Sequence, residues 1–301
     1  MADMVISKKA WGLLLLLSAI WGASFLFIEL ALVAMGPVTL VFFRVLIGAL
    51  TLAIYVAIAK ISLPKEIGFW RSAFVMGALN NAIPFMLIAY GQVTITGGMA
   101  SIINANTAFF GVLVAALFIA NERLQSRRLC GVLIGVGGVV IVVGPTELRN
   151  LDVSSMGQLA VILATLSYAF ASVWGKLRLQ GYGGAVTAFA TSLCASLVMG
   201  PVMLMSEGVP HFEITGQLWL VAIGLGVFGT AGAYLLYFKI LSLAGASNLM
   251  LVTIIVPIFA VTLDALVLQQ WVSFEDIVGF GVIAMGLAVM DGRLLTRFYP
   301  K

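Results

Sequence analysis

The chain has 301 residues, of which 62% are hydrophobic and only 9% are charged. A soluble domain of this length cannot bury so much apolar side-chain surface, so the composition excludes that class and predicts a membrane protein. The formal net charge of +4 reflects which loops face the cytoplasm and does not indicate a nucleic-acid partner.

The apolar residues form ten segments, each near the roughly 20 residues that a helix needs to cross the hydrocarbon core of a bilayer. None alternates polar and apolar residues as an outer-membrane strand does, so helices are the remaining backbone solution. We expect spans at residues 11–33, 38–59, 72–92, 98–120 and 129–145 in the first half of the chain, and at 156–178, 184–206, 217–240, 246–270 and 276–294 in the second.

The basic residues indicate which way the spans run. With the N-terminus in the cytoplasm, 14 of the 16 lysines and arginines lie on the cytoplasmic side, whereas Arg149 is external and Arg44 is inside a span. The external loops carry acids instead: Glu147, Asp152, Glu207, Glu213, Glu275 and Asp276. This asymmetry follows the positive-inside rule. It predicts a multi-pass protein of a bacterial-type inner (cell) membrane with both termini in the cytoplasm.

A shift of 147 residues superposes similar landmarks in the two halves. It pairs Trp21 with Tyr168, Phe42 with Phe189, Gly77 with Gly224, Tyr90 with Tyr237 and Gly98 with Gly245. The near-constant offset predicts two repeats, residues 1–147 and 148–301. Because each repeat has an odd number of spans, the second must enter the membrane upside down. We therefore expect an all-α membrane protein of ten transmembrane helices, in two inverted five-helix repeats around a central cavity, as in many secondary transporters.

Glycines on one face of a span indicate close helix packing. Gly131, Gly135 and Gly138 share a face of the fifth span, and Gly279 and Gly286 repeat the outer two positions on the tenth. Small residues let helices approach where lipid provides no hydrophobic drive. The fifth and tenth spans are expected to pack at the periphery, away from any pathway.

Polar and aromatic side chains inside spans are the candidates for a substrate site. In lipid they should face the interior or a watery cavity, and aromatic faces can stack on planar groups or hold cations. The alternative for each is a plain helix-to-helix hydrogen bond or core packing. The candidate residues are Trp21, Ser24, Asn80, Asn81, Ser101, Asn104, Tyr168, Ser172, Tyr234 and Tyr237.

Three ionisable residues lie inside spans, all expected in the outer third: Glu29, Arg44 and Asp264. Unpaired charges are costly there, so pairing is expected. Glu29 and Arg44, on consecutive helices, form the expected pair. Asp264 or Glu29 would then take up protons and couple transport to the proton gradient, and the alternative is a purely structural ion pair or triad.

The chain lacks the groups that catalysis would need. Its one histidine, His211, is expected in an external loop, so neither a histidine triad nor a multi-histidine metal site can form within the chain. No nucleophile-elbow or zinc-protease motif occurs. We expect no enzymatic activity, no metal and no cofactor.

Three short motifs add a family resemblance. Trp21–Phe25 (WGASF), Phe42–Arg44 (FFR) and Asn121–Leu124 (NERL), in this order, resemble the drug/metabolite transporter superfamily, and most closely its EamA-type ten-helix exporters. The chain is similar in length and span count to the aromatic-amino-acid exporter branch. It departs from the pattern at Gln269–Trp271, where the family often repeats a glutamate.

The resemblance implies a basket-shaped bundle whose cavity is lined chiefly by spans one to four and six to nine. It also implies a secondary transporter that exports amino acids or similar small metabolites by alternating access, with the bilayer and protons as its other partners. A passive channel, or an exporter of drug-like compounds, is the alternative.

Overall fold

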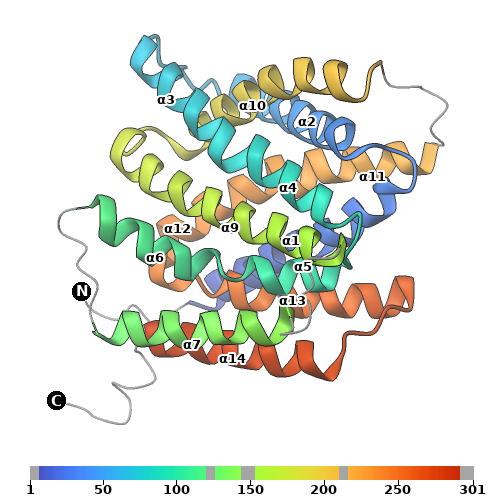
Figure 1. Ribbon diagram of the computed structural model, residues 1–301. Coiled ribbons are helices and arrows are strands. Elements are labelled where there is room, and N and C mark those ends of the chain that lie inside the picture. The colour runs from blue at the N-terminus through green and yellow to red at the C-terminus, as the bar shows by residue number, and fades with distance from the viewer. Residues whose placement is uncertain (1–6, 120–125, 144–152, 210–215, 292–301) are drawn as a thin grey trace.

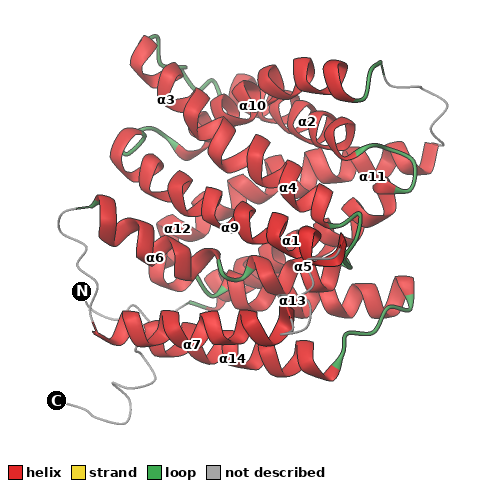
Figure 2. Cartoon of the chain, viewed as in Figure 1, coloured by secondary structure: helices red, strands yellow, loops and turns green. Residues whose placement is uncertain are grey.

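The computed structural model describes residues 7–119, 126–143, 153–209 and 216–291, and every regular element in these ranges is helical (Figures 1 and 2). The NERL motif, His211 and residues 144–152, where the two expected repeats meet, lie outside them. The helices of the first half are α1 (Lys8–Leu32), α2 (Pro37–Ile58), α3 (Ile67–Gly77), η1 (Ala78–Ala82), α4 (Ile83–Gly91), α5 (Gly97–Asn104), α6 (Thr107–Phe118) and α7 (Ser126–Val143). Those of the second half are α9 (Val153–Arg178), α10 (Gly184–Ser206), α11 (Gly216–Gly226), η2 (Val227–Gly232), α12 (Ala233–Leu249), α13 (Val252–Leu263), η3 (Asp264–Leu268) and α14 (Phe274–Asp291).

Local sequence signals set several helix starts. The Ser7 hydroxyl accepts a hydrogen bond from the Ala10 N–H at 3.2 Å, and Thr96 does the same for Met99 at 3.2 Å. Each thereby satisfies one of the N–H groups that a helix start leaves without a partner. Pro37 begins α2, where its missing N–H has no consequence. The helices therefore begin within a few residues of the predicted spans.

Eight helical stretches are long and apolar enough to cross a membrane, judged by length and composition. A further apolar stretch, Val252–Leu268, is shorter. α14 has 18 residues but carries Glu275 and Asp276 in its first turn. The multi-pass all-helical architecture is therefore confirmed, and the full count of ten spans stays a prediction.

The third and eighth predicted spans are interrupted at matching places. α3 and α11 both have 11 residues, and each runs directly into a π-helical turn, η1 or η2, before the helix continues as α4 or α12. A π turn inserts one extra residue into the helical repeat, and such turns are frequent at functional sites. Both fall near the middle of their spans.

The fourth span, predicted as one helix over 98–120, is broken between α5 and α6 at residues 105–106. The related break in the second half comes at residues 250–251, between α12 and α13, and the chain also bends within α12 at Gly245, whose φ is 76°. Only glycine adopts such a backbone conformation readily. The chain therefore turns at Gly245, close to where the ninth span was predicted to begin.

Helices from the two halves interleave in matched pairs. α2 of the first half packs on α10 of the second. The contact of α1 with α13 is matched by that of α9 with α6. The contact of α4 with α9 is likewise matched by that of α12 with α1. α7 and α14 lie side by side at one edge of the bundle, opposite the edge that holds α2, α10 and α11 (Figure 1). Contacts between halves thus form much of the core.

α7 and α14, the fifth and tenth predicted spans, contact each other through the glycine faces that the sequence marks for close packing. A Cβ atom added at Gly138 would lie 2.8 Å from the Gly279 carbonyl oxygen, and one at Gly131 would lie 2.6 Å from that of Gly286. The two backbones therefore touch. Gly135 also faces the ring of Phe109 on α6.

Candidate functional site

A buried cluster of polar side chains joins the two halves in the middle of the bundle. The Tyr234 hydroxyl of α12 donates to Asn81 Oδ1 at 2.7 Å, and Asn80 Nδ2 donates to the same hydroxyl at 2.9 Å. Asn81 Nδ2 in turn lies 3.4 Å from the Ser192 hydroxyl of α10. Asn81 is fully buried, whereas Asn80 and Tyr234 are half-buried. We call Asn80, Asn81, Ser192 and Tyr234 the amide cluster.

The π-helical turns account for this placement. η1 carries Asn80 and Asn81, and its Leu79 carbonyl accepts a hydrogen bond from Ser167 of α9 at 2.7 Å. η2 carries Thr230, whose hydroxyl donates to the Leu225 carbonyl at 3.1 Å. Carbonyls at an irregular turn are therefore satisfied by side-chain hydroxyls, as a membrane interior requires.

Arg44 lies beside the amide cluster and is buried, with 6% of its surface exposed. Its Nε donates to the Thr230 hydroxyl at 3.2 Å, and its Cζ is 3.8 Å from the centroid of the Phe85 ring. Tyr168 and Tyr234 are close enough to interact with it electrostatically. The position follows from close packing, because a Cβ at Gly48, one turn along α2, would lie 2.8 Å from Thr230.

The expected ion pair between Glu29 and Arg44 is not formed. Glu29 accepts hydrogen bonds from the Gly97 N–H at 2.9 Å and from Gln270 Nε2 at 2.7 Å. The physical reason is that α2 packs on α10 and α11, so Arg44 faces the bundle interior, while the end of α1 meets the start of α5. The prediction was wrong because consecutive helices need not face each other.

Glu29 and Asp264 instead share the N-terminus of α5. Asp264, with 2% of its surface exposed, accepts from the Gly98 N–H, and its Oδ1 has no partner among the residues that the structure describes. Carboxylates are favoured at a helix N-terminus by the exposed N–H groups and the helix dipole. We call Glu29, Asp264 and Gln270 the acidic cluster.

Other predicted site residues lie on α1, α5 and α12. The Trp21 and Tyr237 rings are 6.1 Å apart, and Ser24 packs against Gly229 of η2, so α1 lines the same interior. Ser101 bonds the Gly98 carbonyl.

Neither Asn104 nor Ser172 makes a side-chain hydrogen bond to another described element. Asn104 Oδ1 is buried without a described partner. Ser172 is exposed and bonds only the Ala169 carbonyl of its own helix, at 2.7 Å.

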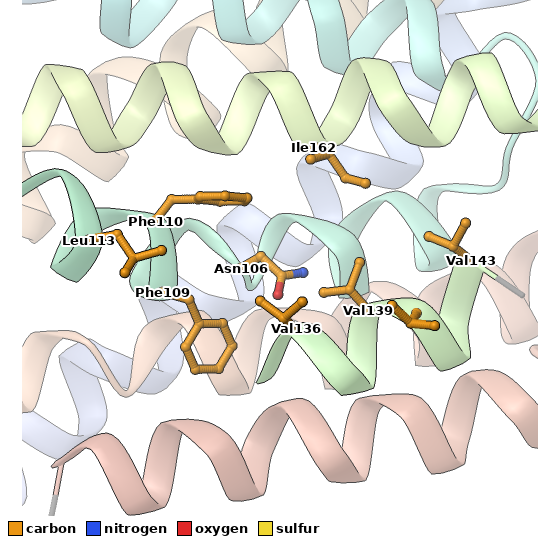
Figure 3. Close-up of a pocket in the computed structure, with 9 residues that line it drawn as sticks. Asn106, Phe109, Phe110, Leu113, Val136, Val139, Val143 and Ile162 are labelled. Atoms are coloured by element: carbon orange, nitrogen blue, oxygen red, sulfur yellow. The ribbon is translucent and has the colours of Figure 1, made fainter. Parts of the chain in front are cut away.

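A cavity of about 200 Å³ lies elsewhere, between α6, α7 and α9 (Figure 3). Apart from Asn106, its lining side chains are apolar, and none of the predicted site residues is among them. The Asn106 amide bonds the Ile103 carbonyl at 2.6 Å. We place the candidate site at the amide cluster, since an apolar pocket without converging polar groups offers little specificity for a ligand.

The chemistry that the described residues can offer is hydrogen bonding and charge. No group of three or more histidine, cysteine, aspartate or glutamate side chains in those parts of the chain could hold a metal ion. Sequence reasoning did not select Phe85 or Ser192 for the site and placed Arg44 in an ion pair. The adjacent Pro84 was the one local signal near Phe85.

Replacing Tyr234 by phenylalanine should lower stability by about 1–3 kcal/mol, because Asn80 Nδ2 and Asn81 Oδ1 would each lose a hydrogen bond inside the bundle. The matched control is Tyr237→Phe on the same helix, since the Tyr237 hydroxyl makes no hydrogen bond to any described residue. Thermal unfolding of both purified variants in detergent would measure the difference. Equal melting temperatures would contradict the observed cluster.

Comparisons with known proteins agree with this architecture. The profile of the EamA-like transporter family matches twice, over residues 9–144 and 155–290. A probable amino-acid metabolite efflux pump of Salmonella typhimurium is 26% identical, covering 94% of this chain and 95% of its own length. The uncharacterized transporter YoaV of Bacillus subtilis is also 26% identical, covering 89% of this chain and 91% of its own. A crystal structure with 18% identity superposes on 98% of this chain and 99% of its own with a TM-score of 0.70, a likeness of fold.

Proposed function

Because this chain belongs to the EamA-like transporter family, we propose that it is a secondary transporter that exports amino acids or similar small metabolites by alternating access. Its substrate would bind at the amide cluster. The observation that carries the proposal is the set of hydrogen bonds by which Asn80 and Asn81 of the first half meet Tyr234 and Ser192 of the second. Two relatives named as probable amino-acid metabolite efflux pumps support the substrate class and the direction.

The cluster has the chemistry for a small polar solute. Amides both donate and accept hydrogen bonds, so they suit a ligand that carries both an amine and an acid. Asn80, Tyr168, Tyr234 and Tyr237 are only half-buried although helices surround them. Partial access in mid-span fits a site that opens to water.

Alternating access needs two halves that move against each other around the site. Residues 1–147 and 148–301 would form these inverted repeats. The bonds of the amide cluster and the Arg44–Thr230 bond cross between them. Breaking and remaking such bonds would link substrate binding to the movement.

We assign proton coupling to the acidic cluster. Asp264 Oδ1 is buried and has no hydrogen-bond donor among the described residues. A buried carboxylate oxygen without a donor is unfavourable unless the carboxyl group takes up a proton. Glu29, on the neighbouring helix, is the second acid. The cluster would face the outside in a bacterial-type inner membrane, with both termini in the cytoplasm as the basic loops predict.

The test is transport in proteoliposomes with a panel of amino acids, with and without a pH gradient. The expected result is saturable counterflow of at least one amino acid. Transport that does not saturate and shows no counterflow would indicate a passive channel. Counterflow of apolar cations alone would replace the substrate class by drug-like compounds and leave the transporter assignment intact.

A further inference from the structure

Arg44 is the only charged side chain described at the centre of the bundle, and no described carboxylate pairs with it. A guanidinium has five N–H donors. Nε uses one on the Thr230 hydroxyl, and no residue in the described ranges accepts from the other four. Its remaining neighbours, Phe85, Tyr168 and Tyr234, are neutral aromatic groups.

The two acids within the spans that could neutralise Arg44 are hydrogen-bonded to other groups. Both oxygens of Glu29 accept hydrogen bonds, from Gly97 and Gln270, and Asp264 caps the start of α5 through Gly98. A cation–π contact and one hydroxyl compensate a buried charge only in part. The centre of the molecule therefore has a positive charge that no described carboxylate neutralises.

A carboxylate suits the remaining N–H donors of Arg44 better than other anions do. Arginine holds carboxylates through two parallel N–H···O bonds, and four N–H groups remain for that. A single arginine among neutral groups balances one negative charge, whereas a phosphate dianion would need more. The expected spans that form the rest of the wall supply no second lysine or arginine near the site.

We propose that Arg44 binds the carboxylate of the transported solute, so that the substrates are small monocarboxylates. The inference rests on the proposed function, because it takes the centre of the bundle as the substrate site. The amide cluster next to Arg44 would receive the solute's amine or other polar group, since Tyr234 contacts both Asn80 and Asn81. Phe85 and Tyr168 would flank the carboxylate.

The first arm of the test uses the unmodified protein in detergent. Thermal stabilisation is measured with phenylalanine, leucine and threonine, each against its amide, and with 3-phenylpropionate, phenethylamine and phenyl phosphate. At least one acid should stabilise the protein, with its amide at least about 30-fold weaker, the effect typical of removing one partner of a buried charge pair. Stabilisation by an amide or an amine equal to that by the acid would overturn the proposal, as would tighter binding of phenyl phosphate or no binding of any acid.

The second arm uses variants in proteoliposomes. Arg44→Gln should reduce carboxylate export at least about 30-fold. Arg44→Lys, which keeps the charge and loses the paired donors, should reduce it by roughly tenfold. Arg71→Gln, at an exposed arginine of α3, is the control and should export normally. Full carboxylate export by Arg44→Gln would overturn the proposal, and the ligand comparison on the unmodified protein decides it if that variant fails to fold.

The carboxylate assignment and the transporter assignment are overturned by different results. Transport of amides or amines that does not depend on Arg44 would overturn the carboxylate assignment and leave a transporter. Absence of counterflow for every acid, amide and amine would overturn the proposed function together with this inference.

Discussion

Replacing Gly138 by valine should destabilise the protein by about 3 kcal/mol, at the upper end of what overpacking costs. The new Cβ would lie 2.8 Å from the Gly279 carbonyl oxygen and from the Ile283 backbone nitrogen. Backbone atoms cannot move aside as a flexible side chain can, so α7 and α14 would have to separate. The expected measurements are a lower apparent melting temperature in detergent and a smaller folded yield.

Gly137→Val provides a matched control. Gly137 is the next residue on α7, is exposed, and has no atom within 4 Å of its added Cβ. Both substitutions change intrinsic helix propensity alike, so the difference between them reports the helix contact alone. Equal stability of the two variants would mean that α7 and α14 do not approach as described.

A second large effect is expected on the coupling of solute transport to the proton gradient. Asp264→Asn and Glu29→Gln together should abolish the accumulation that a pH gradient drives. With one proton per solute, a gradient of one pH unit can support about tenfold accumulation. In the double variant the ratio should fall to about one, whereas counterflow without a gradient continues. The neutral side chains keep an oxygen that can accept from Gly97 and Gly98, so the structure of the site is preserved.

Glu207→Gln is the control for this prediction. The Glu207 carboxylate accepts hydrogen bonds from Val38 and Thr39 at 3.0 and 2.9 Å, so it too caps a helix N-terminus, that of α2. Unlike Asp264 it is exposed. It should retain gradient-driven accumulation. If the double variant also retained it, the acidic cluster would have no part in coupling.

Much of the fold could be predicted from the sequence, because length and hydropathy determine what a bilayer accepts. The glycines at 131, 138, 279 and 286 correctly indicated faces of close helix packing, although not that the fifth span packs on the tenth. The breaks in the helices were not foreseen. Residues 105–106 contain neither proline nor glycine, whereas η1 is closely followed by Pro84 and η2 contains Gly229 and Gly232, signals that weaken a helix without specifying a π turn.

The sequence predicted many of the residues of the site but not all of the contacts between them. Asn80 and Asn81 do meet Tyr234, although Tyr234 lies more than 150 residues further along the chain. The partner of Arg44 was predicted wrongly, because proximity in sequence was taken as proximity in space. Which face of α2 meets η2 depends on the close approach at Gly48, a contact that cannot be read from one chain's hydropathy.

The paired π turns have a consequence for ancestry. Each directly follows the glycine that ends the preceding helix, Gly77 or Gly226, in segments that otherwise share little sequence. A π turn arises when one residue is inserted into an α-helix. If the two halves descend from one duplicated gene segment, the insertion is older than the duplication. Sequence drift then replaced the side chains of η1 and η2 with amides in one copy and threonine in the other, while the distorted backbone stayed.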